Sequence, residues 1–180
     1  MRYLLAGEQT ERLRFREIEP GDFDLWLPFF HDPSSHEHWH GSLDKPDREC
    51  KKWFVRQAER YENNEGGMNA LVERSSGTLI GFCGLLVQNI DGVREMEVGY
   101  SLLPNGRNKG FATEAAKKCR NFAFENNFTD SLISIVSLTN SPSANVAIKN
   151  GMKIEKLTSY KENKVNIFRI LKSDWLKLEN

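Results

Sequence analysis

Residues 96–116 read M-E-V-G-Y-S-L-L-P-N-G-R-N-K-G-F-A-T-E-A-A, and this stretch contains two different periodic patterns on either side of a glycine-bearing turn. Its first part predicts a strand over about Arg94 to Leu103, which Pro104-Asn105-Gly106 ends. A helix is expected from about Gly110 to Asn127, because its apolar residues recur at the spacing of one buried helix face. The stretch should therefore form a strand, a glycine-bearing loop and a helix in direct succession.

A loop that opens a helix in this way can bind an anion. Backbone N–H groups in the first helical turn lack partners within the helix, and the helix dipole adds positive charge there. Gly110 has no Cβ to hold a phosphate away, and Arg107 and Lys109 can add charge-assisted contacts. The glycine spacing fits neither a P-loop nor a dinucleotide fingerprint. A simpler interpretation, in which Gly110 only starts a helix, stays open at this point.

The rest of the chain predicts further strands and helices. Asp22 is a plausible N-cap for the first helix, and the second should begin near Pro46 or Asp47. The expected order is β-α-α-β-β-β-α-β-α-β-β, which implies an α/β fold with a mixed sheet and helices on both of its faces. The expected strands outside residues 96–116 are Thr10–Arg16, Met68–Glu73, Thr78–Gln88, Leu132–Leu138, Met152–Tyr160 and Lys164–Leu171. No linker or repeat interrupts this order, so residues 1–180 should form a single domain.

Composition indicates an ordinary globular protein, since 39% of the residues are apolar and 28% are charged. A formal net charge of zero does not point to nucleic acid or to a membrane surface as a partner. No apolar run approaches the ~20 residues that span a bilayer, and the apolar start of the chain is too short for a signal peptide. The three cysteines are an odd number without a C-x-x-C pair, which argues against a disulfide framework or thiolate zinc site. We therefore expect a cytoplasmic protein.

The segment R-N-K-G-F-A, Arg107 to Ala112, matches the [QR]-x-x-G-x-[GA] signature of the GNAT superfamily of N-acetyltransferases. Four further segments resemble its ribosomal-protein N-terminal acetyltransferase (Rim-type) subgroup: T-E-R-L-R-F-R at 10–16, I-G-F-C-G-L at 80–85, E-V-G-Y-S-L-L-P at 97–104 and V-S-L-T-N-S-P-S-A-N-V-A-I-K-N-G-M at 136–152. The resemblance implies a GNAT-like twisted mixed sheet of about seven strands that is splayed between its fourth and fifth strands. Pantetheine would enter that splay.

The resemblance also implies acetyl-CoA as cosubstrate and assigns its contacts. The backbone of Leu102 and Leu103 would pair with pantetheine, and Asn140 would hold the same arm. Asn145 is a further cofactor candidate. Main-chain N–H groups would wrap the pyrophosphate over Arg107, Asn108, Lys109, Gly110, Phe111, Ala112 and Thr113.

Acetyl transfer to an amine needs a base that keeps the attacking nitrogen neutral. Glu97 is the candidate, because it lies on the strand that leads to the loop and because some relatives use a carboxylate at the matching position. The alternative is that Glu97 only pairs with a neighbouring Lys or Arg.

The departing thiolate also needs a donor. Many relatives use a tyrosine at the position that Ala147 occupies here, so that donor is missing. The Rim-type pattern N-x-x-S matches Asn140-Ser141-Pro142-Ser143 and makes Ser143 the candidate donor. Both residues could instead serve as helix-cap and turn residues.

The polar segment from His31 to Pro46 contains His36, His38 and His40, whose alternation raises a metal hypothesis. No cysteine lies nearby, and we expect no metal site. In the GNAT superfamily this region lines the acceptor-amine site, so the resemblance makes Asp32, His38 and Trp39 candidate substrate contacts.

These patterns together predict an acetyl-CoA-dependent N-acetyltransferase that acts on a primary amine by direct transfer in a ternary complex. The resemblance suggests a protein N-terminal α-amine of the ribosomal-protein kind. A small amine is an alternative acceptor, and a non-catalytic acetyl-CoA-binding module and a nucleotide-phosphate binder are alternatives of other classes. A monomer and a homodimer both fit the sequence.

Overall fold

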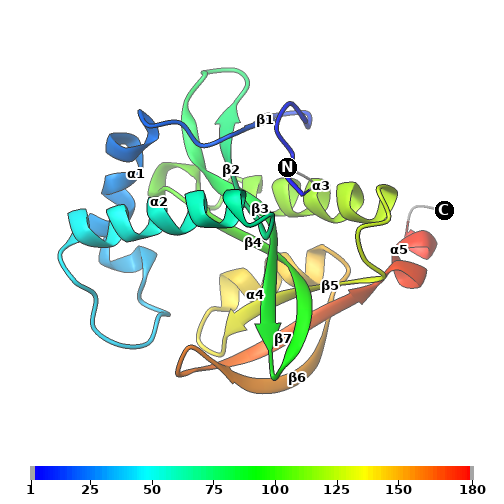
Figure 1. The fold of residues 1–180 in the computed structure, drawn as a ribbon. Coiled ribbons are helices and arrows are strands. Elements are labelled where there is room, and N and C mark those ends of the chain that lie inside the picture. The colour runs from blue at the N-terminus through cyan, green and yellow to red at the C-terminus, as the bar shows by residue number, and fades with distance from the viewer. Residues whose placement is uncertain (1–2, 179–180) are drawn as a thin grey trace.

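The computed structural model describes residues 3–178. The strands are β1 (Leu13–Arg16), β2 (Gly66–Glu73), β3 (Leu79–Ile90), β4 (Val93–Leu102), β5 (Ser131–Ser137), β6 (Lys153–Tyr160) and β7 (Asn163–Leu171). The α-helices are α1 (Asp22–His31), α2 (Pro46–Glu62), α3 (Phe111–Glu125), α4 (Ser141–Lys149) and α5 (Lys172–Leu178), with short 3-10 helices η1 (Pro33–Ser35) and η2 (Pro104–Gly106). Figure 1 shows their arrangement.

All seven strands form one mixed sheet in the order β1-β2-β3-β4-β5-β7-β6. Neighbouring strands are antiparallel except β4 and β5, which are parallel and pair at one position, Glu97 with Ile133. Beyond that position the two strands diverge toward their C-terminal ends. The fold prediction, a mixed sheet splayed between the fourth and fifth strands, is confirmed.

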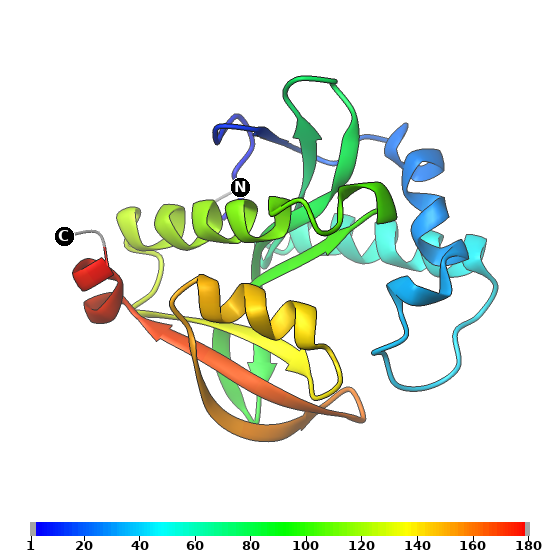
Figure 2. The same ribbon diagram turned by 180° about the vertical axis from the view of Figure 1, so that it is seen from behind.

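Helices cover both faces of the sheet. α1 and α2 lie on one face, whereas α3 and α4 lie on the other, as the two opposite views show (Figures 1 and 2). Fully buried Trp26 packs against Phe82 of β3 on the first face. Ala115 and Cys119 of α3 are buried on the second. The apolar residues Met96, Val98 and Leu102 of β4 all belong to the second core, so the residues that alternate with them, Glu97 among them, face the first helix layer.

Several local expectations were wrong in detail. Gly21, not Asp22, is the N-cap of α1; Asp22 is buried and its carboxylate accepts hydrogen bonds from Arg16 at 2.6 and 2.7 Å. A buried ion pair therefore replaces the expected cap. Pro33–Ser35 forms a 3-10 turn inside the predicted loop. The segment after it also turns, so it lacks the extended form that would align His36, His38 and His40.

The cysteines are free thiols, but two of them meet in the core. Cys83 of β3 and Cys119 of α3 are fully buried with their Sγ atoms 3.5 Å apart. Burial raises the pKa of Cys119 well above its usual value, which keeps this thiol protonated. The two thiols therefore act as apolar side chains that pack α3 against β3.

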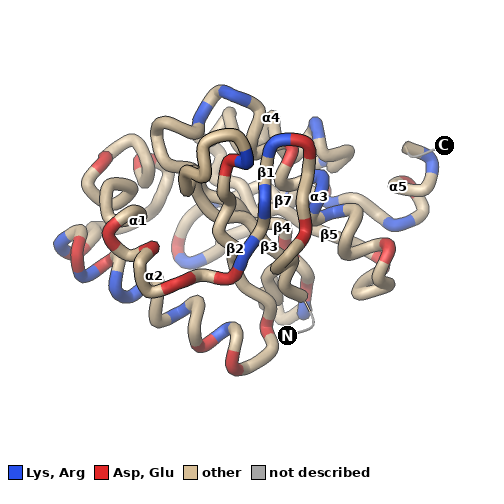
Figure 3. The backbone as a smooth tube through the Cα atoms, turned by 90° about the horizontal axis from the view of Figure 1, so that it is seen from above, with Lys and Arg blue, Asp and Glu red and all other residues tan. Residues whose placement is uncertain are grey.

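Acidic and basic residues are interspersed over the molecule in Figure 3, in keeping with the balanced charge. Within residues 3–178 no helix is both long and apolar enough to cross a bilayer.

Where β4 and β5 separate, a side chain replaces the lost backbone pairing. The hydroxyl of Ser134 on β5 donates to the carbonyl of Val98 on β4 at 3.0 Å, and Ser134 is buried. Ser134→Ala should lower the free energy of unfolding by about 1–3 kcal/mol, because the carbonyl then loses this donor in a buried place. Urea denaturation measures the loss. Ser159→Ala on the exposed face of β6 is the control and should stay within about 0.5 kcal/mol. Equal effects of both changes would contradict this role of Ser134.

Candidate active site

A cavity of about 640 Å³ lies where the C-terminal end of β4, the loop before α3, the start of α4 and the segment after α1 meet. The predicted residues that line it are Leu102, Arg107, Asn108, Gly110, Phe111, Ala112, Thr113, Asn140, Ser143, Asn145, His38 and Trp39. Glu97, Asp32, Leu103 and Lys109 are not among its lining residues. The structure thus gathers most of the predicted contacts from four separate stretches of the chain.

The loop before α3 presents unpaired backbone donors to this cavity. Asn108 and Gly110 have φ of 59° and 83°, in the left-handed region that Asn and Gly tolerate best. The first backbone bond of the helix runs from the N–H of Glu114 to the carbonyl of Gly110 at 3.1 Å. The N–H groups of residues 108–113 have no hydrogen-bond acceptor within residues 3–178. Such a set of N–H groups at a helix start suits an anion.

Arg12 braces this loop from outside, a role that the sequence did not reveal. Its guanidinium donates to the carbonyl of Lys109 at 2.9 Å and to the carboxylate of Glu114 at 2.6 Å, and it stacks on the Phe111 ring at 4.6 Å. A Cβ on Gly110 would come within 3.3 Å of the same guanidinium. About a hundred residues separate Arg12 from these partners, so no local pattern could have shown the contact.

The Arg107 side chain, expected to contact a phosphate, is engaged by groups of the protein. Its guanidinium donates to Asp32 at 3.1 Å and to Ser34 at 2.9 Å, and its Nε donates to the carbonyl of Leu102 at 3.1 Å. Hydrogen bonds from Ser34 and Ser35 and the charge of Arg107 lower the pKa of Asp32. Asp32 is therefore engaged within the protein and ties the segment after α1 to the loop. It remains only a predicted substrate contact.

Leu103 does not offer the backbone groups that were expected of it. Its N–H donates to the carbonyl of Ile80 at 3.0 Å, and its carbonyl accepts from the N–H of Gly106 at 2.9 Å. The side chain is buried against α1. Of the predicted pantetheine pair, Leu102 alone lines the cavity.

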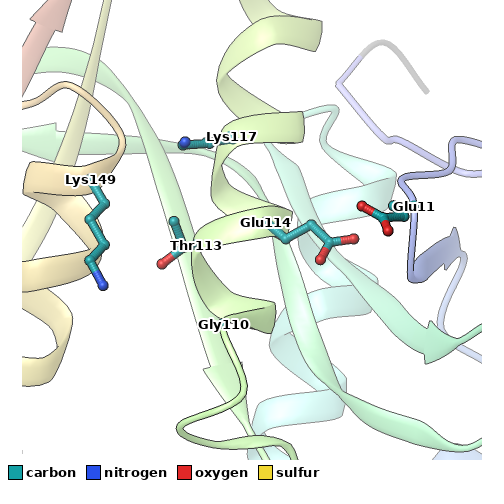
Figure 4. A pocket seen from close by; sticks show the side chains of 6 residues that line it. All are labelled: Glu11, Gly110, Thr113, Glu114, Lys117 and Lys149. Carbon is teal, nitrogen blue, oxygen red and sulfur yellow. The ribbon is translucent and has the colours of Figure 1, made fainter.

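A second hollow of about 400 Å³ adjoins the first turns of α3 and is shown in Figure 4. Lys117, Thr113 and, from α4, Lys149 lie together on one side of α3, whereas Glu114 points the other way toward Glu11 (Figure 4). Two ammonium groups thus stand beside the N-terminal end of α3. They were not singled out from the sequence, because only the packing of α4 beside α3 brings Lys149 there.

Glu97 lies at the pairing position of β4 and β5, on the face that α1 and α2 cover. Gln88 of β3 donates from Nε2 to the Glu97 carboxylate at 2.6 Å. The other end of this amide, Oε1, accepts from Arg60 at 3.1 Å and from Tyr160 at 3.0 Å. Because both acceptor positions of Oε1 are used, the amide nitrogen is held toward Glu97.

Burial raises the pKa of Glu97, and the Gln88 amide, the charges of Arg60 and Lys161 and the N–H of Ile135 oppose that rise. A carboxyl with a raised pKa is a more effective base near neutral pH. The bond to Gln88 also fits the alternative of a structurally satisfied strand residue.

Ser143 and Asn140 lie at the start of α4. Asn140 is the N-cap, and its Oδ1 accepts from the N–H of Ser143 at 3.0 Å, so the capping interpretation is confirmed. Both side chains also line the cavity, so a cap and a ligand contact are compatible. Ala147 is buried in the core and presents no polar group to the cavity.

His38 and Trp39, from the segment after α1, line one side of the cavity. The His38 ring nitrogen Nδ1 lies 3.0 Å from the hydroxyl of Thr139, and the His38 carbonyl accepts from Asn163 at 3.0 Å. These bonds join the segment after α1 to the start of α4 and to the β6–β7 turn. Trp39 is 45% exposed, unusual for so large a ring, and it packs beside Phe29. Residues 3–178 contain no group of three His, Cys, Asp or Glu side chains that could hold a metal ion.

Comparison with known proteins identifies the family. Residues 12–153 match the model of the acetyltransferase (GNAT) domain, and the chain belongs to this family. It is 31% identical over 149 residues to the uncharacterized protein YkkB of Bacillus subtilis, covering 82% of this chain and 85% of that protein. The chain is accordingly an acetyltransferase, and its family binds acetyl-CoA.

Solved structures share the fold over nearly the whole chain. An acetyltransferase from Agrobacterium tumefaciens superposes with a TM-score of 0.76 at 26% identity, covering 91% of this chain and 92% of its own. A ribosomal α-N-protein acetyltransferase in complex with coenzyme A gives 0.72 at 14% identity, with coverage of 92% and 97%. A Vibrio cholerae spermidine N-acetyltransferase in complex with CoA and spermine gives 0.72 at 16%, with coverage of 93% and 99%. At such identities the last two show a shared fold.

The Gln88 bond predicts how Glu97 titrates. Gln88→Leu should raise the pKa of Glu97 further, because it removes a donor that stabilises the ionised form. NMR titration of the Glu97 carboxyl carbon measures the pKa, and Gln9→Leu, an exposed change elsewhere, is the control. If ionised Glu97 is needed for turnover, the acid limb of kcat/KM should move to higher pH in the same variant. An unchanged or lower pKa of Glu97 would contradict the bond.

Proposed function

We propose that this chain transfers the acetyl group of acetyl-CoA directly to a primary amine in a ternary complex. The observation that carries the proposal is the run of unpaired N–H groups over residues 108–113, which lie at the start of α3 beside the cavity. These donors suit a pyrophosphate, since they supply both hydrogen bonds and the positive end of the helix dipole. Asn108, Lys109, Gly110, Phe111, Ala112 and Thr113 would bind it, and Leu102, Asn140 and Asn145 would contact the pantetheine arm.

In this proposal Arg107 serves the cofactor loop as a brace, because its guanidinium is engaged by Asp32 and Ser34. Its N–H, which was expected to contact the pyrophosphate, donates to the carbonyl of Pro104 at 3.2 Å. Pantetheine would enter between β4 and β5, where the strands have separated. The thioester would then lie near the pairing position, with Glu97 toward the α1 and α2 face and Ser143 on the α4 side.

For the chemistry we assign Glu97 as the base that takes a proton from the amine, directly or through a water. The raised pKa of Glu97 supports this role, as does its position at the vertex of the splay. Ser143 would donate to the departing thiolate, since its hydroxyl lines the cavity. His38 and Trp39 would contact the acceptor.

The acceptor is proposed to be a protein N-terminal α-amine, because four segments of the chain resemble the Rim-type subgroup. A small amine is the alternative, and solved proteins of this fold include one named for a ribosomal protein and one named for spermidine. Fold and cofactor site do not fix the acceptor. A non-catalytic acetyl-CoA-binding module is a second candidate function, favoured by the buried Ala147 where many relatives carry a tyrosine.

Gly110→Glu should abolish acetyl-CoA binding, because it puts bulk and negative charge at the pyrophosphate position and strains a residue with φ of 83°. Isothermal titration calorimetry measures the affinity. Gly110→Asn tolerates the same φ without added charge and should lose much less affinity. Gly21→Glu, at a position with open space, is the control and should bind as the wild type does. Undiminished binding by Gly110→Glu would overturn the loop assignment.

Glu97→Gln should lower kcat by about a hundredfold and leave the affinity for acetyl-CoA unchanged, since it removes a base that does not contact the cofactor loop. Release of free CoA with a panel of peptides and small amines measures turnover. Glu59→Gln, an exposed change on α2, is the matched control. An unaffected kcat would place the base elsewhere. Tight acetyl-CoA binding by the wild type with no turnover on any amine would favour the non-catalytic module.

A further inference from the structure

A phenol from β4 reaches across the splay to the candidate donor on α4. The Tyr100 hydroxyl lies 2.7 Å from the Ser143 hydroxyl and 3.0 Å from the Ser143 carbonyl. Tyr100, Ser143 and Asn140 all line the cavity. Tyr100 alternates with Val98 and Leu102 along β4, so its side chain is on the α3 and α4 face, opposite Glu97. This contact joins the two walls between which the thioester would lie.

The contact between the Tyr100 and Ser143 hydroxyl groups can have either group as the hydrogen-bond donor. The phenol and the serine hydroxyl each have one proton, and the phenol can direct its proton to Ser143 Oγ or to the Ser143 carbonyl. The Oγ contact is the shorter of the two. Burial raises the pKa of Tyr100, so the phenol stays protonated at neutral pH and can serve only as a donor or neutral acceptor. If the phenol donates to Oγ, the Ser143 proton is free to point into the cavity.

The hydrogen bonds around Ser143 also leave its hydroxyl proton free to point into the cavity. Asn140 accepts the Ser143 N–H at 3.0 Å, which fixes the first turn of α4 and the position of the Ser143 side chain. No other side-chain acceptor for the Ser143 hydroxyl lies within the described residues. The sulfur of coenzyme A, if bound between β4 and α4, would therefore be an available acceptor for that proton.

We propose that Tyr100 is a positioning residue for acetyl transfer: its phenol donates to Ser143 Oγ and thereby directs the Ser143 hydroxyl proton at the departing sulfur of coenzyme A. This inference rests on the proposed function. The amine nitrogen bonds to the thioester carbonyl carbon, the C–S bond breaks, and its electron pair goes to sulfur. The surplus amine proton passes to Glu97 and then to water. The hydrogen bond from Ser143 stabilises the thiolate until water protonates it.

Tyr100 on β4 and Ser143 on α4 would together provide the donor for the thiolate that a tyrosine at position 147 would provide alone. Ala147 is buried and apolar, whereas the phenol of Tyr100 reaches the same helix from the opposite strand. Tyr100 acts through Ser143, so its removal should matter only while the serine hydroxyl is present.

The test is a double-mutant cycle of Tyr100→Phe and Ser143→Ala, measured as single-turnover acetyl transfer to an amine that the wild type accepts. Tyr100→Phe should lower the rate about tenfold without changing the KM for acetyl-CoA, because it removes one neutral hydrogen bond and keeps the ring. The double variant should be no slower than Ser143→Ala. Tyr3→Phe, which lies against Phe128 outside the cavity, is the control and should leave the rate unchanged.

Two results would overturn the proposal. An unchanged rate in Tyr100→Phe would mean that the phenol donates to the Ser143 carbonyl and holds no donor in place. Losses that multiply in the double variant would mean that Tyr100 acts independently of Ser143. Ser143→Ala keeps the test valid if Tyr100→Phe folds poorly, because a Ser143→Ala rate equal to that of the wild type also overturns it. Failure of the proposed function would appear differently, as a wild type that acetylates no amine.

Discussion

The separation of β4 from β5 after a single paired position is the constraint on which the rest of the site depends. If the two parallel strands continued to pair, their backbone N–H and C=O groups would bond to each other and leave no room for a ligand between the strands. Here the pairing stops after Glu97 and Ile133, and the Ser134 hydroxyl satisfies the Val98 carbonyl beside the gap. The strands can therefore part without an unsatisfied group at the vertex. The opening lies between the two helix layers, so side chains from both layers can line a ligand within it.

Two arginines hold the loop before α3 in a form that leaves the amides of residues 108–113 free. Arg12 bonds to the loop from the β1 side, and Arg107 joins it to Asp32 and Ser34 in the segment after α1. An arginine in a phosphate-binding signature would ordinarily be expected to contact the phosphate through its charge. In this chain the charge organises the loop, and the backbone provides the donors. The segment after α1 is attached to the loop through the same arginine, so both walls of the cavity are held together there.

Much of the fold could be predicted from sequence, because local patterns encode it. Alternation and helical periodicity gave the order of strands and helices, and Gly110 marked the start of α3. Contacts between distant residues could not be read in this way. The brace of Arg12, the amide of Gln88 and the phenol of Tyr100 each depend on how the elements pack. Asp22 misled for a different reason: its partner Arg16 is near in sequence, at a separation of 6 residues, but it lies on β1 and pairs with Asp22 only through the packing of β1 beside α1.

An NMR titration can test whether the amides of residues 108–113 form the pyrophosphate site of acetyl-CoA. Amide chemical shifts of the ¹⁵N-labelled chain would be followed as acetyl-CoA is added, with ATP in a parallel titration. We expect saturable shifts of the 108–113 amides with acetyl-CoA, accompanied by shifts at Leu102 and Asn140 beside the cavity. ATP should produce weaker shifts confined to the loop. Acetyl-CoA that leaves the 108–113 amides unshifted, or ATP that binds them more tightly, would mean that the pyrophosphate site lies elsewhere.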